Sequence, residues 1–215
     1  LLENALSKNF ELIKSWHLDA LINMSTGSFP AELIKVIFDG GTVLADFGSE
    51  WGVGFAHPYG PAMAELFDRL KDYGHKTVGY VSTIDRLLFR YDERGKAFRE
   101  GVRRCGMCQD EDLVEFNEEH AVLSENVGYE GLKRLLERRS DVTAVFCTND
   151  MAAIGAIRAA RDLKLRVPED LSVIGCDDIN LASMTTPRLT SIHFDRKELG
   201  NLIAREVIRL IESKQ

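Results

Sequence analysis

Short runs of branched and other apolar residues recur along the chain, separated by longer stretches of mixed character. Runs of this length, bounded by polar residues and glycine, are typical of strands buried on both faces of a sheet. We therefore predict strands over residues 19–23, 42–45, 77–81, 113–116, 142–147 and 171–176.

The stretches between these runs carry apolar residues at the helical period. The clearest one follows Gly60-Pro61, places Met63 and Phe67 on one face, and stops at Gly74, as expected for proline near the start of a helix and glycine after its end. Further helical stretches surround residues 94–102, 132–136, 151–157 and 197–213, and the chain opens in another at 7–17. Strands separated by single helices predict an α/β fold with parallel sheets covered on both faces.

Composition and charge narrow the class of protein. The chain has 215 residues, 45% of them hydrophobic and 28% charged, which is the balance of a globular protein. Its formal net charge of -7 does not favour phosphate binding, so this stretch is not expected to bind nucleic acid by itself. Neither an apolar run of about 18 residues nor a signal peptide is visible, which favours a cytoplasmic protein without membrane contact.

The four cysteines give little indication of a metal or cofactor. Cys147 and Cys176 close apolar strands, where free thiols usually pack as small hydrophobic groups in a reducing compartment. Cys105 and Cys108 have the spacing of half a zinc site, but no second Cys/His pair lies at the matching distance. We interpret that spacing as coincidental and expect no cofactor.

Polar residues follow most of the predicted strands, where ligands of parallel sheets bind. These positions are Met24, Ser25, Asp46, Ser82, Thr83, Asn149, Asp150, Asp177 and Asp178. Asp150 is expected to cap the next helix. For Asn149, both helix capping and ligand binding remain possible roles. Asp177 and Asp178 could serve a turn, or one carboxylate could accept hydrogen bonds from ligand hydroxyls.

Arg94 opens a predicted helix and is either a solvated surface residue or a planar fork for vicinal hydroxyls or a carboxylate. No nucleophile elbow, phosphate loop, zinc-binding helix motif or dinucleotide fingerprint accompanies these polar groups. The five histidines are scattered, and none forms a recognisable pair with a nucleophile. The protein is therefore not expected to be an enzyme.

Several segments together resemble the lactose/galactose-repressor family. The matching segments are residues 145–160, 167–178 and 187–192 in the second half, with Tyr73-Gly-His75 and the helix start at 93–98 upstream. Ala97 replaces a glycine of the family pattern, and His57-Pro-Tyr-Gly60 departs from its usual opening.

This resemblance implies a two-lobed, periplasmic-binding-protein-like fold. One lobe would comprise residues 1–57 and 193–215, and the other residues 58–192. It also implies a homodimer that binds operator DNA through a helix-turn-helix domain outside these residues. On that comparison the chain is expected to be incomplete at both ends.

The same resemblance implies a small sugar-like effector bound between the lobes. The effector-binding arginine, asparagine and aspartate of the family fall on Arg94, Asn149 and Asp177, with further contacts expected from Met24, Ser25, Asp46, Leu123 and Phe194. The alternative is an exported sugar-binding protein of a transporter, which shares the fold.

Overall fold

The computed structural model of the chain consists of two compact units. The described residues are 15–23, 34–35, 37, 39–47, 53–55, 59–90, 92–118 and 123–213. The first unit comprises Leu1–His57 and Asp195–Gln215, and the second comprises Pro58–Phe194. The sequence-based division placed the start of the returning segment at residue 193 rather than 195.

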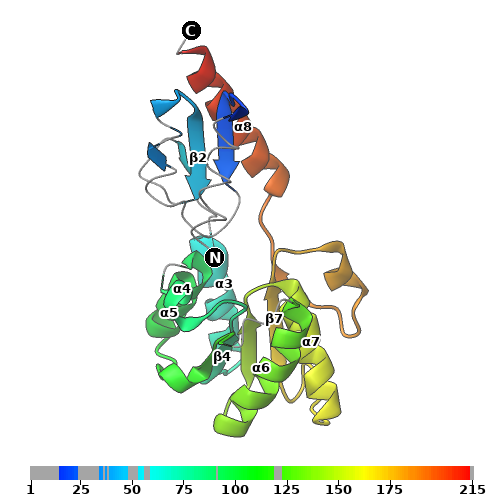
Figure 1. The fold of residues 1–215 in the computed structure, drawn as a ribbon. Coiled ribbons are helices and arrows are strands. Elements are labelled where there is room, and N and C mark those ends of the chain that lie inside the picture. The colour runs from blue at the N-terminus through cyan, green and yellow to red at the C-terminus, as the bar shows by residue number, and fades with distance from the viewer. Residues whose placement is uncertain are drawn as a thin grey trace. The chain divides into compact units, whose positions relative to one another are not determined.

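The second unit is a five-stranded parallel sheet with helices on both faces, which confirms the predicted α/β class (Figure 1). The sheet order is β5-β4-β6-β7-β8. Its strands are β4 (Val78–Val81), β5 (Val114–Glu115), β6 (Ala144–Cys147), β7 (Ser172–Cys176) and β8 (Thr190–Ile192). Its helices are α3 (Tyr59–Asp72), α4 (Arg86–Phe89), α5 (Glu93–Cys105), α6 (Ser124–Arg138) and α7 (Asp150–Asp162), with 3-10 turns η1 (Glu111–Leu113) and η2 (Asn180–Met184).

Two hydrophobic cores cover the two faces of this sheet. Tyr80, Phe98 and Phe146 belong to the core on the side of α3 and α5. Leu132 and Leu135 belong to the core on the side of α6 and α7. Because strands β4 and β6 contribute to both cores, they are buried along their whole length, as their uninterrupted apolar runs predict.

Two helices end at glycines, and the end at Gly74 was predicted. Helix α3 ends at Asp72, and Gly74 follows with a φ of +86° while His75 N–H donates to the carbonyl of Leu70. Gly106 ends α5 in the same left-handed conformation. Helix α3 begins at Tyr59, so Pro61 lies within the first turn rather than at the first position. The missing N–H of Pro61 costs no helical hydrogen bond there, because N–H groups of the first turn have no partner within the helix.

The first unit has a parallel sheet in the order β1-β2-β3, with α8 (Arg196–Glu212) packed against it. The strands are β1 (Ala20–Asn23), β2 (Val43–Phe47) and β3 (Val53–Phe55). Val43, Ala45, Ile203 and Val207 form the core between them. The predicted helix over 7–17 lies mostly outside the described residues, and among those described no helix is long and apolar enough to cross a membrane.

Candidate functional site

The polar residues of the second unit meet where the connections of its sheet reverse direction. From β4 the chain crosses to β5 on one side and then returns to β6 on the other, so the carboxyl ends of β4 and β6 lie side by side. The N–H of Thr83 donates to Oγ1 of Thr148 at 3.2 Å across this point. Such a reversal opens a crevice at the carboxyl edge of an α/β sheet, which is where ligands bind.

Arg94 is held against the end of β6. Its Nη1 donates to the carbonyl of Thr148 at 3.2 Å, and its Nε donates to Oδ1 of Asp92 at 3.2 Å. The side chain is only 13% exposed, and burial alone would lower its pKa. Asp92 and the nearby tyrosines outweigh that effect and raise the pKa of Arg94, so the guanidinium stays charged. A fixed cationic fork therefore lies beside Asn149.

Asp92 positions this arginine and was not identified from the sequence. It caps α5 by accepting the N–H of Gly95 at 3.0 Å, and it also accepts the hydroxyl of buried Tyr80 at 3.4 Å. An aspartate immediately before a helical stretch is a recognised cap signal that points to this role. Asp92 therefore sets both the start of α5 and the direction of Arg94.

Asn149, rather than Asp150 as predicted, caps helix α7, and capping was one of the two roles left open for Asn149. Asn149 is the cap of α7, because its Oδ1 accepts the N–H of Ala152 at 2.9 Å. This bond turns the amide nitrogen away from the helix, toward Ser124 at 3.4 Å. Asn149 can therefore cap the helix with its oxygen and still donate to a ligand through Nδ2.

Asp150 is buried and holds the loops that surround the site. Its Oδ1 accepts the hydroxyl of Ser191 on β8 at 2.6 Å, and its Oδ2 accepts the N–H of Ile179 at 2.8 Å. The predicted capping role of Asp150 is thus wrong, since tertiary partners take both carboxylate oxygens. Gly175 is required opposite it, because a Cβ there would lie 2.3 Å from Oδ1 of Asp150.

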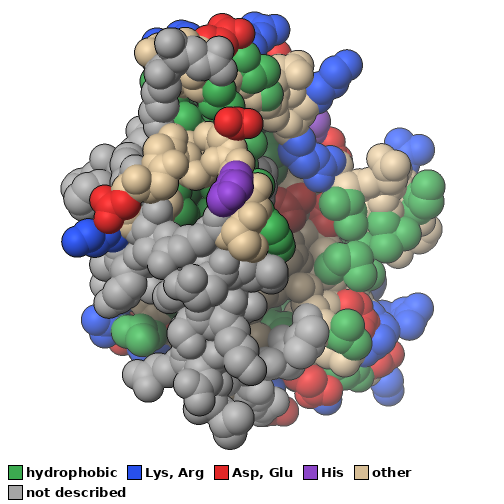
Figure 2. All heavy atoms as spheres, turned by 45° about the horizontal axis from the view of Figure 1, so that its top comes forward, with side chains coloured by type: hydrophobic (Ala, Val, Ile, Leu, Met, Phe, Trp, Pro, Cys, Tyr) green, Lys and Arg blue, Asp and Glu red, His purple; other side chains and the backbone are tan. Residues whose placement is uncertain are grey.

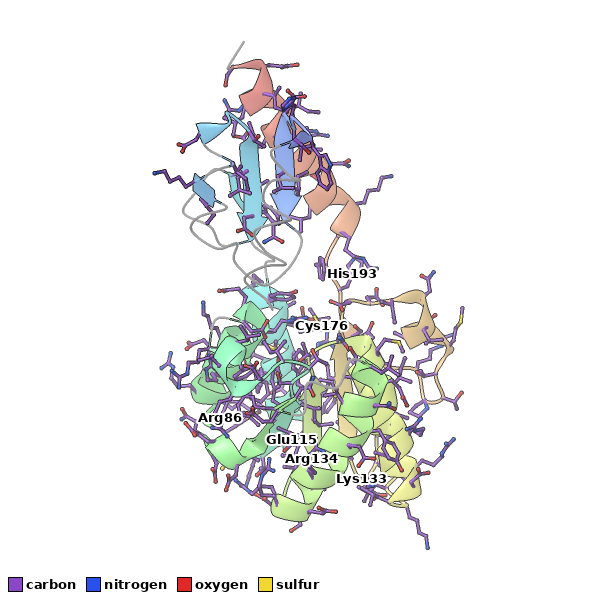
Figure 3. The ribbon with its side chains drawn as sticks, viewed as in Figure 1. Arg86, Glu115, Lys133, Arg134, Cys176 and His193 are labelled. Atoms are coloured by element: carbon purple, nitrogen blue, oxygen red, sulfur yellow. The ribbon has the colours of Figure 1, made fainter. Side chains whose placement is uncertain are left out.

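Asp177 and Asp178 follow β7 in a left-handed backbone conformation. Their φ angles are +104° and +46°, which non-glycine residues rarely adopt and which cost about 1–3 kcal/mol each. The N–H of Asp177 donates to the carbonyl of Ile192 at 3.0 Å, and Asp178 pairs with His193 at 2.9 Å. Cys176 and His193 mark the ends of β7 and of the β8 segment in Figure 3. Strain of this kind is concentrated at functional sites.

Aromatic and apolar groups complete the surroundings of Arg94. The ring of Tyr59 lies 5.9 Å from the guanidinium, and Phe194 packs edge-on against Tyr59 with ring centroids 6.0 Å apart. Burial raises the pKa of Tyr59, and Asp177 raises it further while Arg94 opposes both. Burial also raises the pKa of Cys176 to about 12, so this thiol is not a thiolate nucleophile at neutral pH.

The remaining predicted ligand contacts lie in different places. Leu123 precedes α6 and is 64% exposed. Asp46 belongs to the first unit and lies inside β2 rather than after it, because that strand extends to Phe47. Its Oδ1 accepts Nδ2 of Asn23 at 2.9 Å, and both side chains are buried. Met24 and Ser25 lie outside the described residues.

Within the described part of the chain, no group of three or more histidine, cysteine, aspartate or glutamate side chains could hold a metal ion. Cys105 is buried and Cys108 is exposed, and Cys105 donates to Asp68 at 3.8 Å while Cys108 accepts from Arg139 at 3.6 Å. The two thiols thus have separate polar partners.

Comparison with known proteins identifies the family. Residues 67–215 match the periplasmic binding protein-like domain family. The chain belongs to this family. A relative is the HTH-type transcriptional repressor PurR of Pasteurella multocida strain Pm70, 33% identical over 221 residues that cover 95% of this chain and 62% of that protein. The repressor CytR of Escherichia coli strain K12 is 34% identical over 140 residues, or 65% of this chain and 39% of CytR. The chain thus spans less than two thirds of these relatives.

Solved structures of transcription regulators share the fold. A CelR transcriptional regulator in complex with cellobiose superposes with a TM-score of 0.81 at 24% identity, covering 97% of this chain and 64% of that one. A sugar-binding LacI-family regulator from Escherichia coli, complexed with phosphate, gives 0.74 at 24% identity over 90% and 69% of the two chains. The predicted resemblance to lactose/galactose-type repressors is confirmed, and the curated relatives named here are repressors rather than enzymes.

Proposed function

We propose that this chain is the effector-binding part of a transcription regulator, and that Arg94, Asn149 and Asp177 bind a small polar ligand at the carboxyl edge of the second unit's sheet. The observation that carries the proposal is the bond from Nη1 of Arg94 to the Thr148 carbonyl, which fixes the cation next to Asn149. All three residues are partly exposed, Arg94 with 13% of its side chain, whereas Asp92, Thr148 and Asp150 are buried. Buried groups therefore hold the site, and partly accessible groups are available to a ligand.

The chemistry of these groups favours a hydroxylated ligand. Arg94 and Asn149 supply N–H donors, and the Asp177 carboxylate accepts hydrogen bonds from hydroxyls with charge assistance. Tyr59 is 6% exposed, so its ring supports Arg94 from the core side. The CelR structure contains cellobiose, which supports a sugar or sugar derivative as the class to test first.

The proposed output is a change in operator DNA binding through a helix-turn-helix domain outside these residues. A ligand acts in this way only if it binds one conformation better than another, and such coupling is usually about 1–3 kcal/mol. The named relatives are repressors, which favours a cytoplasmic regulator over the sugar-binding protein of a transporter.

We further propose a homodimer that uses the η2 segment. Leu181 and Met184 are 42% and 72% exposed on this segment, and hydrophobic side chains gather on the part of the surface that projects at the right of Figure 2. Contiguous exposed apolar residues are typical of interfaces. Sedimentation velocity of Met184→Glu should show a monomer where the wild type is a dimer; an unchanged dimer would place the interface elsewhere.

The effector site is tested by thermal-shift screening of sugars, sugar phosphates and nucleobases. A ligand at a free concentration of 100 times its Kd stabilises the native state by about 2.7 kcal/mol. For a chain of this size, that raises the Tm by roughly 5–10 °C. The shift should disappear in Asp177→Ala and Arg94→Lys and persist in Asp162→Ala, an exposed carboxylate on α7. A shift that survives both site variants, or no shift with any of the three classes, contradicts the proposal.

A further inference from the structure

A cavity in the same unit is lined by residues other than Arg94, Asn149 and Asp177. Its volume is about 400 Å³, which falls within the range of small-molecule sites. It is lined by residues of α4, α5, the η1 turn and β5. Its lining includes Phe89, Phe98, Val102, Val114 and Phe116.

The inner wall is aromatic and rigidly supported. Phe89 packs edge-on against Phe116 and Tyr80, with ring centroids 5.2 and 5.0 Å apart. On the other face of β5, Glu115 binds Arg134 and Arg138 of α6 at 2.6 and 2.9 Å, so Val114 and Phe116 are held facing the cavity. A wall that contains several aromatic rings favours an aromatic occupant, because aromatic pairs gain energy beyond that of the buried area.

The rim of the cavity carries unbalanced positive charge. It includes three arginines, Arg86, Arg90 and Arg99, and two acids, Asp110 and Glu111. Both acids have partners already, because Asp110 pairs with Arg139 at 2.6 Å and Glu111 pairs with Arg86 at 3.3 Å (Arg86 is labelled in Figure 3). In the described part of the chain, Arg90 and Arg99 have no ion pair within 4.0 Å.

We propose that this cavity binds a small aromatic carboxylate, whose ring lies among Phe89, Phe98 and Phe116 and whose carboxylate is bound by Arg99 and Arg90. The guanidinium of Arg99 already lies 4.8 Å from the centroid of Phe89, at the boundary between the apolar wall and the charged rim. An arginine in that position binds a carboxylate with parallel N–H bonds. The effector crevice has different residues and is not required for this binding.

The wall of this cavity also contacts the groups that position Arg94. A Cβ on Gly95 would lie 2.5 Å from Cε2 of Phe89, so the ring presses directly against the first turn of α5. Tyr80 lies between the rings of Phe89 and Phe98 and donates its hydroxyl to Asp92, which binds Arg94. A ligand that packs against Phe89 therefore contacts the side chains that hold the proposed effector arginine.

The test is titration calorimetry of the chain with 3-phenylpropionate in the absence of any effector. We expect saturable one-to-one binding that Arg90→Gln/Arg99→Gln weakens roughly tenfold or more, since each charged hydrogen bond it removes has that effect on affinity. Arg103→Gln is the matched control, because Arg103 lies on the exposed side of the same helix and pairs with Glu100. The neutral amide, 3-phenylpropanamide, should bind as weakly as the double variant.

Two results would overturn the proposal. One is the absence of saturable binding at millimolar 3-phenylpropionate, and the other is equal affinity in the wild type and the double variant. The link to Arg94 is tested by the amide NMR signal of Gly95, which should shift on binding; an unmoved signal in a saturated sample refutes the link. Because no effector is present, a failed sugar screen does not affect either result.

Discussion

Replacing Asp150 by alanine is the most direct test of how the candidate site is built. The carboxylate is 1% exposed and joins three segments distant in sequence: the start of α7, the turn after β7, and β8. Alanine leaves the N–H of Ile179 and the hydroxyl of Ser191 without this acceptor. A buried polar group without a partner costs about 1–3 kcal/mol, and water offsets part of that cost here because both groups are only part-buried.

The expected loss in the free energy of unfolding is about 2–5 kcal/mol. A loss near 5 kcal/mol requires that the Ile179 N–H and the Ser191 hydroxyl both remain without any acceptor. Two effects move the loss toward 2 kcal/mol. The Ser191 oxygen still accepts the N–H of Asp178 at 3.0 Å, and removing a buried charge removes the cost of its desolvation. Asp150→Asn retains one acceptor oxygen and should lie between the wild type and alanine.

Urea unfolding followed by far-UV circular dichroism measures this loss. Trp16 and Trp51, the protein's only tryptophans, belong to the first unit, so selectively excited tryptophan fluorescence shows whether that unit unfolds separately. Asp162→Ala is the control on the same helix; it removes one exposed bond to Tyr129 at 2.9 Å and should cost about 1 kcal/mol or less. An Asp150→Ala protein within about 0.5 kcal/mol of the wild type would refute the reasoning, as that range is typical of ordinary surface changes.

Two further predictions concern packing and pH. Gly155→Ala should destabilise the fold by about 1–3 kcal/mol or more in urea unfolding, because its Cβ would lie 1.9 Å from the Glu125 carbonyl oxygen. Gly200→Ala in α8 should stabilise the fold by about 0.5–1 kcal/mol, because its Cβ would have nothing within 4 Å. Equal effects of the two substitutions would contradict this packing. Burial lowers the pKa of His75, so below about pH 6.5 the unfolded chain binds more protons and stability falls as the pH decreases. The Tm of the wild type should therefore fall more than that of His75→Gln between about pH 7.5 and about pH 5.5, and parallel curves would exclude His75 as the cause.

The central strands could be predicted because burial on both faces demands continuous apolar residues. That signal placed β4, β6 and β7 within a few residues of their observed bounds. The short strands β3 and β8 were not predicted, since Val53-Gly-Phe55 and Thr190-Ser-Ile192 are too brief and too polar or flexible to be distinguished from loops. Strands β3 and β8 are defined by their pairing with β2 and β7, which is a tertiary contact that a local pattern does not show.

The site was predictable only to the level of the strand ends. Asn149 and Asp150 are both good helix caps, so local propensity cannot choose between them. The choice depends on Ser191 and the N–H of Ile179, which lie 41 and 29 residues away in the sequence. Long-range partners of this kind are not visible in a local pattern.

The same contacts account for the strain beside the site. Ile179 directly follows the two left-handed residues Asp177 and Asp178, and its N–H is held by Asp150. Without that bond, the turn would be free to relax toward ordinary backbone angles, because strained residues persist only where their surroundings fix them. In the proposed effector site, Asp150 therefore has a positioning role, through the turn that carries Asp177, rather than a contact with the ligand. Asp150→Ala should therefore lower the affinity for the effector as well as the stability of the protein, even though the proposed ligand groups on Arg94, Asn149 and Asp177 are all still present.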